Sequence, residues 1–182
     1  MKRHIGLVGA GAWGTALAHV VRSAGHTVGI WSRQKPDLPS LSRANALIIA
    51  VPAQAVRETL AAIRPVLREG LPLIVSAKGI EQGSGKFLNE VVAESAPHAR
   101  PMVLSGPSFA ADVLKGLPTA VVLAAPSMSE AGEWAGVLSI PEFRIYATDD
   151  VLGVEIGGAL KNVLAIACGI SDGRGLGDSA RA

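Results

Sequence analysis

The fold is decided near the amino end of the chain, which reads His4-Ile5-Gly6-Leu7-Val8-Gly9-Ala10-Gly11-Ala12-Trp13-Gly14-Thr15-Ala16-Leu17-Ala18. A short β-type run, Ile5 to Val8, leads into glycines spaced as G-x-G-x-x-G. An apolar pattern of helical period follows from Trp13 to Val21. A strand, a glycine turn and a helix in this order predict a dinucleotide-binding turn.

Each glycine of the turn has a predicted physical role. Gly9 lets the chain turn sharply, Gly11 lets a pyrophosphate approach the backbone, and Gly14 lets the helix lie close to the strand. The free N–H groups and the dipole of the helix N-terminus then face the phosphates. The alternative is a glycine-rich strand–helix turn that binds no ligand.

The second strand predicts which dinucleotide is accepted. The strand covers 27–31 and is followed by Ser32 and Arg33. No carboxylate stands there to bind a ribose hydroxyl. Arg33 is suited to stack on adenine or to pair with a 2′-phosphate. We therefore expect NADP or NAD as cofactor, with NADPH accepted. The alternative is that Arg33 is a solvated loop residue.

Composition limits the remaining possibilities. The chain has 182 residues, is 49% hydrophobic and carries a net charge of +2, which predicts one domain or slightly more and no nucleic-acid partner. We see no signal peptide, and no apolar run of membrane-spanning length. We expect a soluble, cytoplasmic protein with no membrane insertion and no metal site. The single cysteine, Cys168, lies in an apolar run and is expected to serve packing.

Strand and helix patterns alternate along the first 150 residues and predict an α/β fold, a doubly wound Rossmann-like sheet that is mostly parallel. The segment 34–41 is rich in turn formers and predicts a loop with one helical turn. From Val151 to about Ile170 the pattern is purely helical, and a glycine-rich tail follows. We therefore divide the chain into a dinucleotide-binding domain, 1–150, and the beginning of a helical substrate domain, 151–182.

Polar residues follow several of the predicted strands. Arg33, Lys78 and the turn Ser105-Gly106-Pro107-Ser108 each come directly after a strand. Because parallel strands place their carboxyl ends at one edge of a sheet, we expect these residues to converge on one crevice. The alternatives are that Lys78 is a surface lysine and that Ser108 caps the next helix.

A lysine and an asparagine, Lys161 and Asn162, lie among small and apolar residues in the last predicted helix. Burial of an ammonium group lowers its pKa toward neutrality, which suits proton transfer. Glu155 lies six residues earlier and does not share the face of Lys161. Reduction of a ketone by a nicotinamide also requires a proton, which Lys161 could supply while Lys78 and an amide hold the oxygen.

Seven pieces of the sequence, in order along the chain, resemble the NAD(P)-dependent sn-glycerol-3-phosphate dehydrogenases of bacterial type. The pieces are GAGAWGTALA (9–18), WSR (31–33), VP (51–52), AKGIE (77–81), LSGPSFAADV (104–113), GLPTAVVLA (116–124) and GVEIGGALKNVLAIACGISDG (153–173). The resemblance implies reduction of dihydroxyacetone phosphate, a phosphorylated small molecule, to sn-glycerol 3-phosphate, which feeds glycerophospholipid synthesis.

The resemblance also implies roles for individual residues. Lys161 corresponds to the proposed general acid/base, Lys78 lies near both cofactor and substrate, and Asn162 belongs to the same catalytic motif. Gly106 and Ser108 contact the substrate. The remaining cofactor positions are Ala12, Trp13, Arg33 and Ala110.

The chain also departs from the family pattern. The segment Gln34–Asn45 is shorter than the corresponding family segment, which contains an Asn-x-x-Tyr-Leu-Pro stretch. The family continues into a helical domain that supplies an aspartate and an Arg-Asn pair, and Ser179 stands where asparagine is usual. About half of the substrate site is thus expected in this chain.

Two other functions remain open. One is a non-catalytic NAD(P)-binding module. The other is a two-domain dehydrogenase acting on a hydroxy acid or a nucleotide sugar. Apolar surface on the helix from Val151 to Ile170 predicts self-association, for example as a homodimer.

Overall fold

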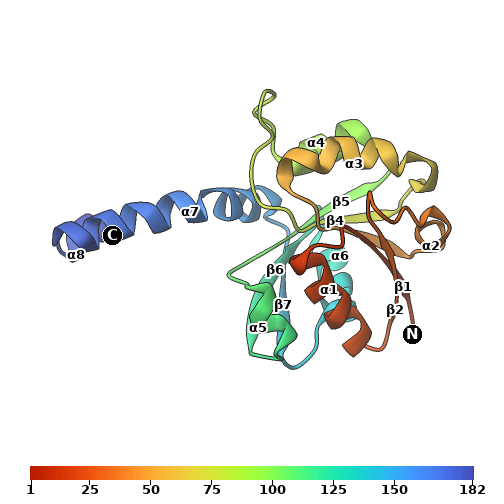
Figure 1. The fold of residues 1–182 in the computed structure, drawn as a ribbon, viewed down its shortest axis with the longest axis horizontal. Helices are drawn as coiled ribbons and strands as arrows, with labels where there is room; N and C mark the ends of the chain where they lie inside the picture. The colour runs from red at the N-terminus through yellow and green to blue at the C-terminus, as the bar shows by residue number, and fades with distance from the viewer.

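The computed structural model describes residues 1–182 and contains one seven-stranded sheet with the strand order β2-β1-β3-β4-β5-β6-β7 (Figure 1). The strands are β1 (His4–Val8), β2 (Thr27–Trp31), β3 (Ala46–Ile49), β4 (Pro72–Val75), β5 (Arg100–Ser105), β6 (Thr119–Ala124) and β7 (Phe143–Thr148). The first five run parallel to one another, β6 is antiparallel to β5, and β7 is parallel to β6. The predicted mostly parallel α/β sheet is confirmed.

Helices cover both faces of the sheet, as Figure 1 shows. They are α1 (Ala12–Ser23), α2 (Leu38–Ser42), α3 (Val56–Ala62), α4 (Leu88–Ser95), α5 (Ala110–Leu114), α6 (Met128–Leu138), α7 (Val151–Arg174) and α8 (Asp178–Arg181), with short 3-10 turns η1 (Ala53–Ala55) and η2 (Arg64–Val66). One core cluster joins the sheet to α1, α5 and α6, and the other joins it to α2, α3 and α4.

The alternation of side chains along each buried strand builds these two cores. In β3, Ala46 and Ile48 belong to the α1 side, whereas Leu47 and Ile49 belong to the α3 side. Successive residues of a strand point to opposite faces, so a continuous apolar run serves both cores. This burial fixes the carboxyl ends of β1 to β5 at one edge of the sheet.

Some boundaries differ from those expected. The apolar run 46–51 favours one strand, but β3 ends at Ile49. The amphipathic pattern from Ala53 to about Arg64 favours one helix, but the structure divides this segment into η1, α3 and η2. The segment 34–41 contains the single short helix α2, whose first turn is capped by the Asp37 side chain accepting from the Ser40 N–H at 3.0 Å. The expectation of a loop with one helical turn is confirmed.

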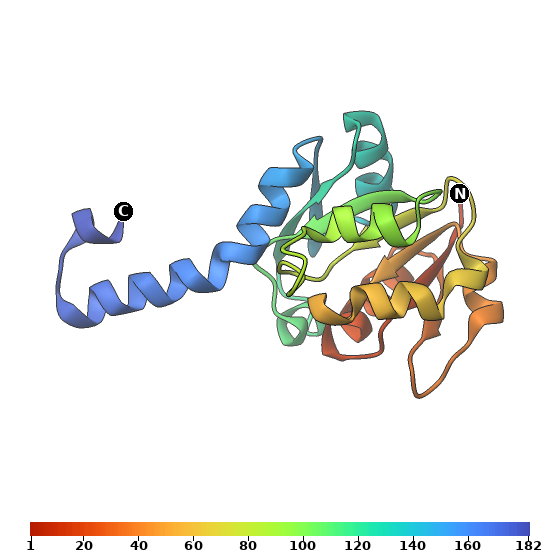
Figure 2. The same ribbon diagram turned by 90° about the horizontal axis from the view of Figure 1, so that it is seen from above.

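The helix α7 is longer than expected and projects away from the sheet (Figures 1 and 2). The Asp150 side chain caps its start, and Gly175, in the left-handed region at φ 64°, ends it. Residues 171–174 are therefore helical and not part of a glycine-rich tail. Only Glu155, Gly158 and Ser171 of α7 are buried, and Cys168 is half-buried, so the packing role of this cysteine stays a prediction.

The exposed part of α7 is strongly apolar. Large apolar side chains are exposed along it, namely Leu152, Ile156, Leu160, Val163, Leu164, Ile166 and Ile170. By length and composition α7 could cross a membrane, with a mean hydropathy of 1.6, which corrects the expectation that no apolar run reaches that length. Core helices of water-soluble proteins satisfy the same criterion.

Candidate functional site: two pockets at one edge of the sheet

The glycine turn between β1 and α1 has the geometry that its sequence predicts. Gly9 has φ +117°, which L side chains rarely adopt, and its N–H donates to the Trp31 carbonyl at 2.8 Å. A Cβ on Gly14 would lie 2.1 Å from the Gly9 carbonyl oxygen, so only glycine allows α1 this close to the turn. Gly11, by contrast, faces open space. No side chain caps α1, so the N–H groups of its first turn remain available to an anion.

A pocket of about 290 Å³ adjoins this turn and is called here the Arg33 pocket. Backbone from Gly9 to Gly11, from Trp31 to Gln34 and from Ala50 to Pro52 lines it. Arg33 is exposed and makes no side-chain hydrogen bond or ion pair. Ala12 is exposed at the start of α1, whereas Trp13 is half-buried, with its ring centroid 6.5 Å from that of Phe143.

A second pocket of about 300 Å³, called here the lysine pocket, lies where α7 crosses the ends of β5 and β6. It is lined by Ser105, Gly106 and Pro107 on one side and by α7 residues up to Lys161 on the other. A Cβ on Gly158 would lie 2.7 Å from Ser105 Oγ and 3.6 Å from Lys78 Cγ. The small residue at position 158 therefore lets α7 lie directly against the end of β5.

Lys161 lines this pocket, and Lys78 lies next to its Gly106 wall in a different environment. Lys78 is half-buried and its Nζ donates to the Gly106 carbonyl at 2.8 Å. Burial lowers the pKa of Lys78, and the positive charge of Lys161 lowers it further. Lys161 itself is exposed and donates to Asn162 Oδ1 at 2.6 Å. The expectation that Lys161 is buried is wrong, because Lys161 lies about one turn beyond Gly158, where α7 extends past the sheet.

The turn after β5 holds Lys78 in place. The Gly106 carbonyl accepts from both Lys78 Nζ and, at 3.3 Å, the Ser108 hydroxyl. The N-cap of α5 is Phe109 and no side chain caps that helix, so the alternative role of Ser108 as a helix cap is wrong. Ala110 is the first residue of α5 and packs on the core beneath it.

The structure separates the predicted crevice into two hollows at one edge. Arg33 follows β2, the edge strand, whereas Lys78 follows β4, three strands away. Strands in a sheet lie about 4.8 Å apart, which places the two strand ends about 14 Å from each other. The residues expected to converge therefore form an elongated edge and not one compact cavity. No group of three or more His, Cys, Asp or Glu side chains could hold a metal ion.

One buried group near the site was not assigned a role from the sequence. Glu155 is 6% exposed, and its Oε1 accepts from the Asn89 N–H in the first turn of α4 at 2.9 Å, while Oε2 is buried without a partner. Burial raises the pKa of the Glu155 carboxyl, against the opposing effect of the backbone hydrogen bonds from Asn89 and Leu88. In the sequence, the signal for this group is that Glu155 is the single acidic residue in the helical segment 151–170.

We expect Glu155→Gln to stabilise the protein at pH 7.5 by about 1 kcal/mol, because a buried negative charge is removed while the amide oxygen still accepts from the Asn89 N–H. A carboxyl whose pKa is raised by folding loses stability as pH rises from its ordinary value through the folded one. The gain should therefore shrink toward pH 4.5, as urea unfolding at the two pH values would measure. The exposed control Glu69→Gln should show no such change, and a loss of stability in Glu155→Gln at pH 7.5 contradicts this account.

Comparison with known proteins agrees with this arrangement. Residues 4–43 and 35–131 match the family described as NAD-dependent glycerol-3-phosphate dehydrogenase N-terminus, and residues 150–182 match the C-terminus of the same family. The N-terminal match is in two segments that overlap at 35–43, between β2 and β3. This is where the chain was expected to be shorter than its family.

Curated relatives extend the match over nearly the whole chain. A glycerol-3-phosphate dehydrogenase [NAD(P)+] of Methylobacterium radiotolerans is 48% identical over 207 residues, covering 98% of this chain and 62% of the relative. A second, from Parvibaculum lavamentivorans, is 45% identical over 208 residues, covering 99% of this chain and 62% of the relative. The chain thus spans about 62% of the length of these relatives. Both alignments exceed its 182 residues, so each contains positions without a counterpart here.

Solved structures agree with the fold. The glycerol-3-phosphate dehydrogenase of Coxiella burnetii superposes with a TM-score of 0.84 at 34% identity, covering 99% of this chain and 64% of that one. The glycerol-3-phosphate dehydrogenase of Plasmodium falciparum superposes with a TM-score of 0.87 at 22% identity, covering 99% of this chain and 62% of that one. At this identity it supports the fold alone. The glycine turn, the lysine pocket and these matches together lead to one conclusion. The chain belongs to the NAD-dependent glycerol-3-phosphate dehydrogenase family, whose members use NAD(P)+.

Proposed function

We propose that this chain forms the cofactor site and part of the substrate site of an enzyme that reduces dihydroxyacetone phosphate to sn-glycerol 3-phosphate with NAD(P)H. The observation that carries the proposal is the lysine pocket itself: Lys161 lines it, and Gly106, which forms part of its wall, accepts a hydrogen bond from Lys78. This pocket lies on the same sheet edge as the glycine turn. In this proposal residues 1–150 form the dinucleotide-binding domain, and 151–182 begin a helical substrate domain.

The residues at the glycine turn fit a dinucleotide. Gly11 leaves open space beside the uncapped first turn of α1, where N–H groups from Ala12 onward suit a pyrophosphate. Arg33, with no other partner, suits an adenosine phosphate. The elongated edge between the Arg33 pocket and the lysine pocket suits an extended ligand. A bound nicotinamide would supply the hydride.

The two lysines would serve the reacting oxygen. Two ammonium groups beside one pocket stabilise negative charge that develops on a carbonyl oxygen. We assign Lys161 as the proton donor and Lys78, held by the Gly106 carbonyl, as the group that holds the oxygen or the substrate phosphate. Asn162 accepts from Lys161 and orients it, and Gly106 forms part of the opposite wall. Ser108 follows in the same turn, and we assign it, with Gly106, to the substrate.

The test is binding of NADPH and NADH by calorimetry, followed by oxidation of each with dihydroxyacetone phosphate. Binding with turnover supports the proposal. Binding without turnover supports the second candidate, a dinucleotide-binding module, which the exposure of Lys161 favours. Absence of binding by either nucleotide contradicts both. A substrate panel including hydroxy acids separates this reaction from that of other two-domain dehydrogenases.

Arg33→Ala is expected to weaken NADPH binding about tenfold and NADH binding much less, because a guanidinium–phosphate contact is lost only for NADPH. Arg33 makes no hydrogen bond in the structure, so folding should be unaffected. Calorimetric titration of both nucleotides into the variant would measure the difference. Equal weakening for the two nucleotides would contradict a contact with the 2′-phosphate.

We also propose that the protein is cytoplasmic and self-associates. Its one cysteine, Cys168, is free, as is usual in a reducing compartment. The exposed apolar face of α7 is large enough to favour contact with a second copy. Sedimentation equilibrium would show a monomer if this part of the proposal is wrong, and cell fractionation tests the compartment.

A further inference from the structure

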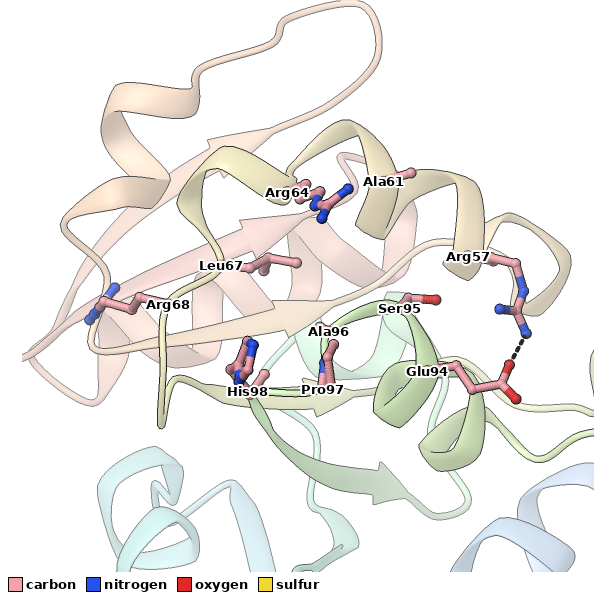
Figure 3. Close-up of a pocket in the computed structure, with 11 residues that line it drawn as sticks. Arg57, Ala61, Arg64, Leu67, Arg68, Glu94, Ser95, Ala96, Pro97 and His98 are labelled. Atoms are coloured by element: carbon pink, nitrogen blue, oxygen red, sulfur yellow. Dashed lines mark hydrogen bonds and ion pairs between the residues drawn. The ribbon is translucent and has the colours of Figure 1, made fainter.

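A groove of about 460 Å³ lies between α3 with its following turn η2 and the end of α4 with the link to β5 (Figure 3). We call it the α3–α4 groove. The segments 64–68 and 96–99 that form one end of it precede β4 and β5, whereas the glycine turn and the lysine pocket follow strands. The groove is thus separate from the site of the proposed function and shares no lining residue with it.

Positive charge in the groove exceeds negative charge. Arg57, Arg64 and Arg68 line it, and Glu94 is the only acid among the lining residues. Glu94 already accepts from Arg57 at 2.8 Å and from Lys86, and Arg57 is further paired with Glu81. Figure 3 shows Arg57 and Glu94 joined at one end of the groove. Its only carboxylate is therefore fully used, and it neutralises neither Arg64 nor Arg68.

The remaining cations have unused hydrogen-bonding capacity. Arg64 makes no side-chain hydrogen bond or ion pair, and Arg68 makes one hydrogen bond, to the Ala44 carbonyl. The His98 ring has no hydrogen-bond partner and lies near Leu67 (Figure 3). A guanidinium presents five N–H donors in a planar fork that matches phosphate and carboxylate groups. Most of these donors remain free here.

The groove between these cations is apolar. Leu67, Pro97 and three alanines line it. The volume is in the range of small-molecule sites, which combine an apolar lining with a few polar groups.

We infer that the α3–α4 groove binds a small organic polyanion, with phosphate or carboxylate groups on Arg64 and Arg68 and the carbon skeleton on the apolar lining. A larger polyanion such as a nucleic acid is disfavoured, because the whole chain carries a net charge of only +2. The inference does not depend on the proposed function.

The test is titration of the isotope-labelled chain with pyrophosphate and, separately, with citrate, each in the absence and in the presence of excess NADP+. We expect amide shift changes confined to 57–68 and 94–99. Arg64→Gln should weaken binding about tenfold or more, because one guanidinium contact is lost. The control is Arg22→Gln, an exposed arginine of α1 that is also without a side-chain partner, which should bind as the wild type does.

The two probes separate the sources of the anion. Tighter binding of pyrophosphate assigns the groove to phosphate esters, and tighter binding of citrate assigns it to carboxylates. Equal affinity in Arg64→Gln and the wild type overturns the inference, as does the absence of shifts at 57–68 and 94–99. Shifts confined to the glycine turn without NADP+ would overturn it and leave the proposed function intact.

Discussion

Replacing Lys161 with methionine is expected to lower kcat for reduction of dihydroxyacetone phosphate by about 100- to 10,000-fold, the usual contribution of a positioned proton donor. The substitution keeps an unbranched side chain, one atom shorter, and removes its charge. Lys161 is exposed and bonds only to Asn162, so stability and NADPH affinity should be unchanged. Steady-state kinetics with each variant would measure the effect.

The same variant should also change a pH profile. The Lys161 charge is the second cause, after burial, of the lowered pKa of Lys78. Without the Lys161 charge the pKa of Lys78 rises, so Lys78 stays protonated to higher pH. The pH at which binding of the anionic substrate is lost should therefore be higher in the variant than in the wild type. Lys115→Met, an exposed lysine at the end of α5, is the matched control. A kcat within threefold of wild type in Lys161→Met contradicts its role as proton donor.

Gly14→Ala is expected to destabilise the protein by about 3 kcal/mol, although alanine is the better helix former. The new Cβ would lie 2.1 Å from the Gly9 carbonyl oxygen, a backbone atom that cannot move without opening the turn. The fold can relieve this contact only by shifting α1 away from β1. Urea unfolding would measure the loss, and NADPH affinity should fall with it.

Gly11→Ala provides the matched comparison, because a Cβ there meets no atom within 4 Å. Its stability should lie within about 1 kcal/mol of wild type, the cost of alanine at a helix N-cap. Its NADPH affinity should nevertheless fall, since the methyl group occupies the space proposed for the pyrophosphate. If Gly11→Ala binds NADPH normally, the pyrophosphate does not lie at this turn. Unchanged stability of Gly14→Ala contradicts the close packing of α1.

The sequence was a good guide where short-range pattern determines structure. The glycine turn and the alternation within strands such as 46–49 depend on residues a few positions apart, and the structure confirms both. Strand order could not be predicted in this way. Arg33 and Lys78 each follow a strand, but their separation depends on β2 being the edge strand, which is a property of the assembled sheet.

Burial was the least predictable property, because it also depends on how elements far apart in the sequence pack together. The neighbours of Lys161 are small and apolar, which favours burial, yet the structure exposes Lys161 because α7 has already passed the end of the sheet at this position. Lys78 is the lysine that burial affects. The helix end was also misplaced, because Gly173 is compatible with a helix and the first glycine to leave it is Gly175, with its positive φ.

The position of Lys161 on α7 has a consequence for the population of competent molecules. It lies three residues beyond Gly158, and Ser171 is the next buried residue along the helix. A helical stretch of this length without tertiary contacts is marginal in water, and Gly169 and Gly173 weaken it further. Helix and coil in this stretch are therefore close in free energy. Anything that covers its apolar face shifts the equilibrium toward the helix and raises the fraction of molecules in which Lys161 stands beside Lys78.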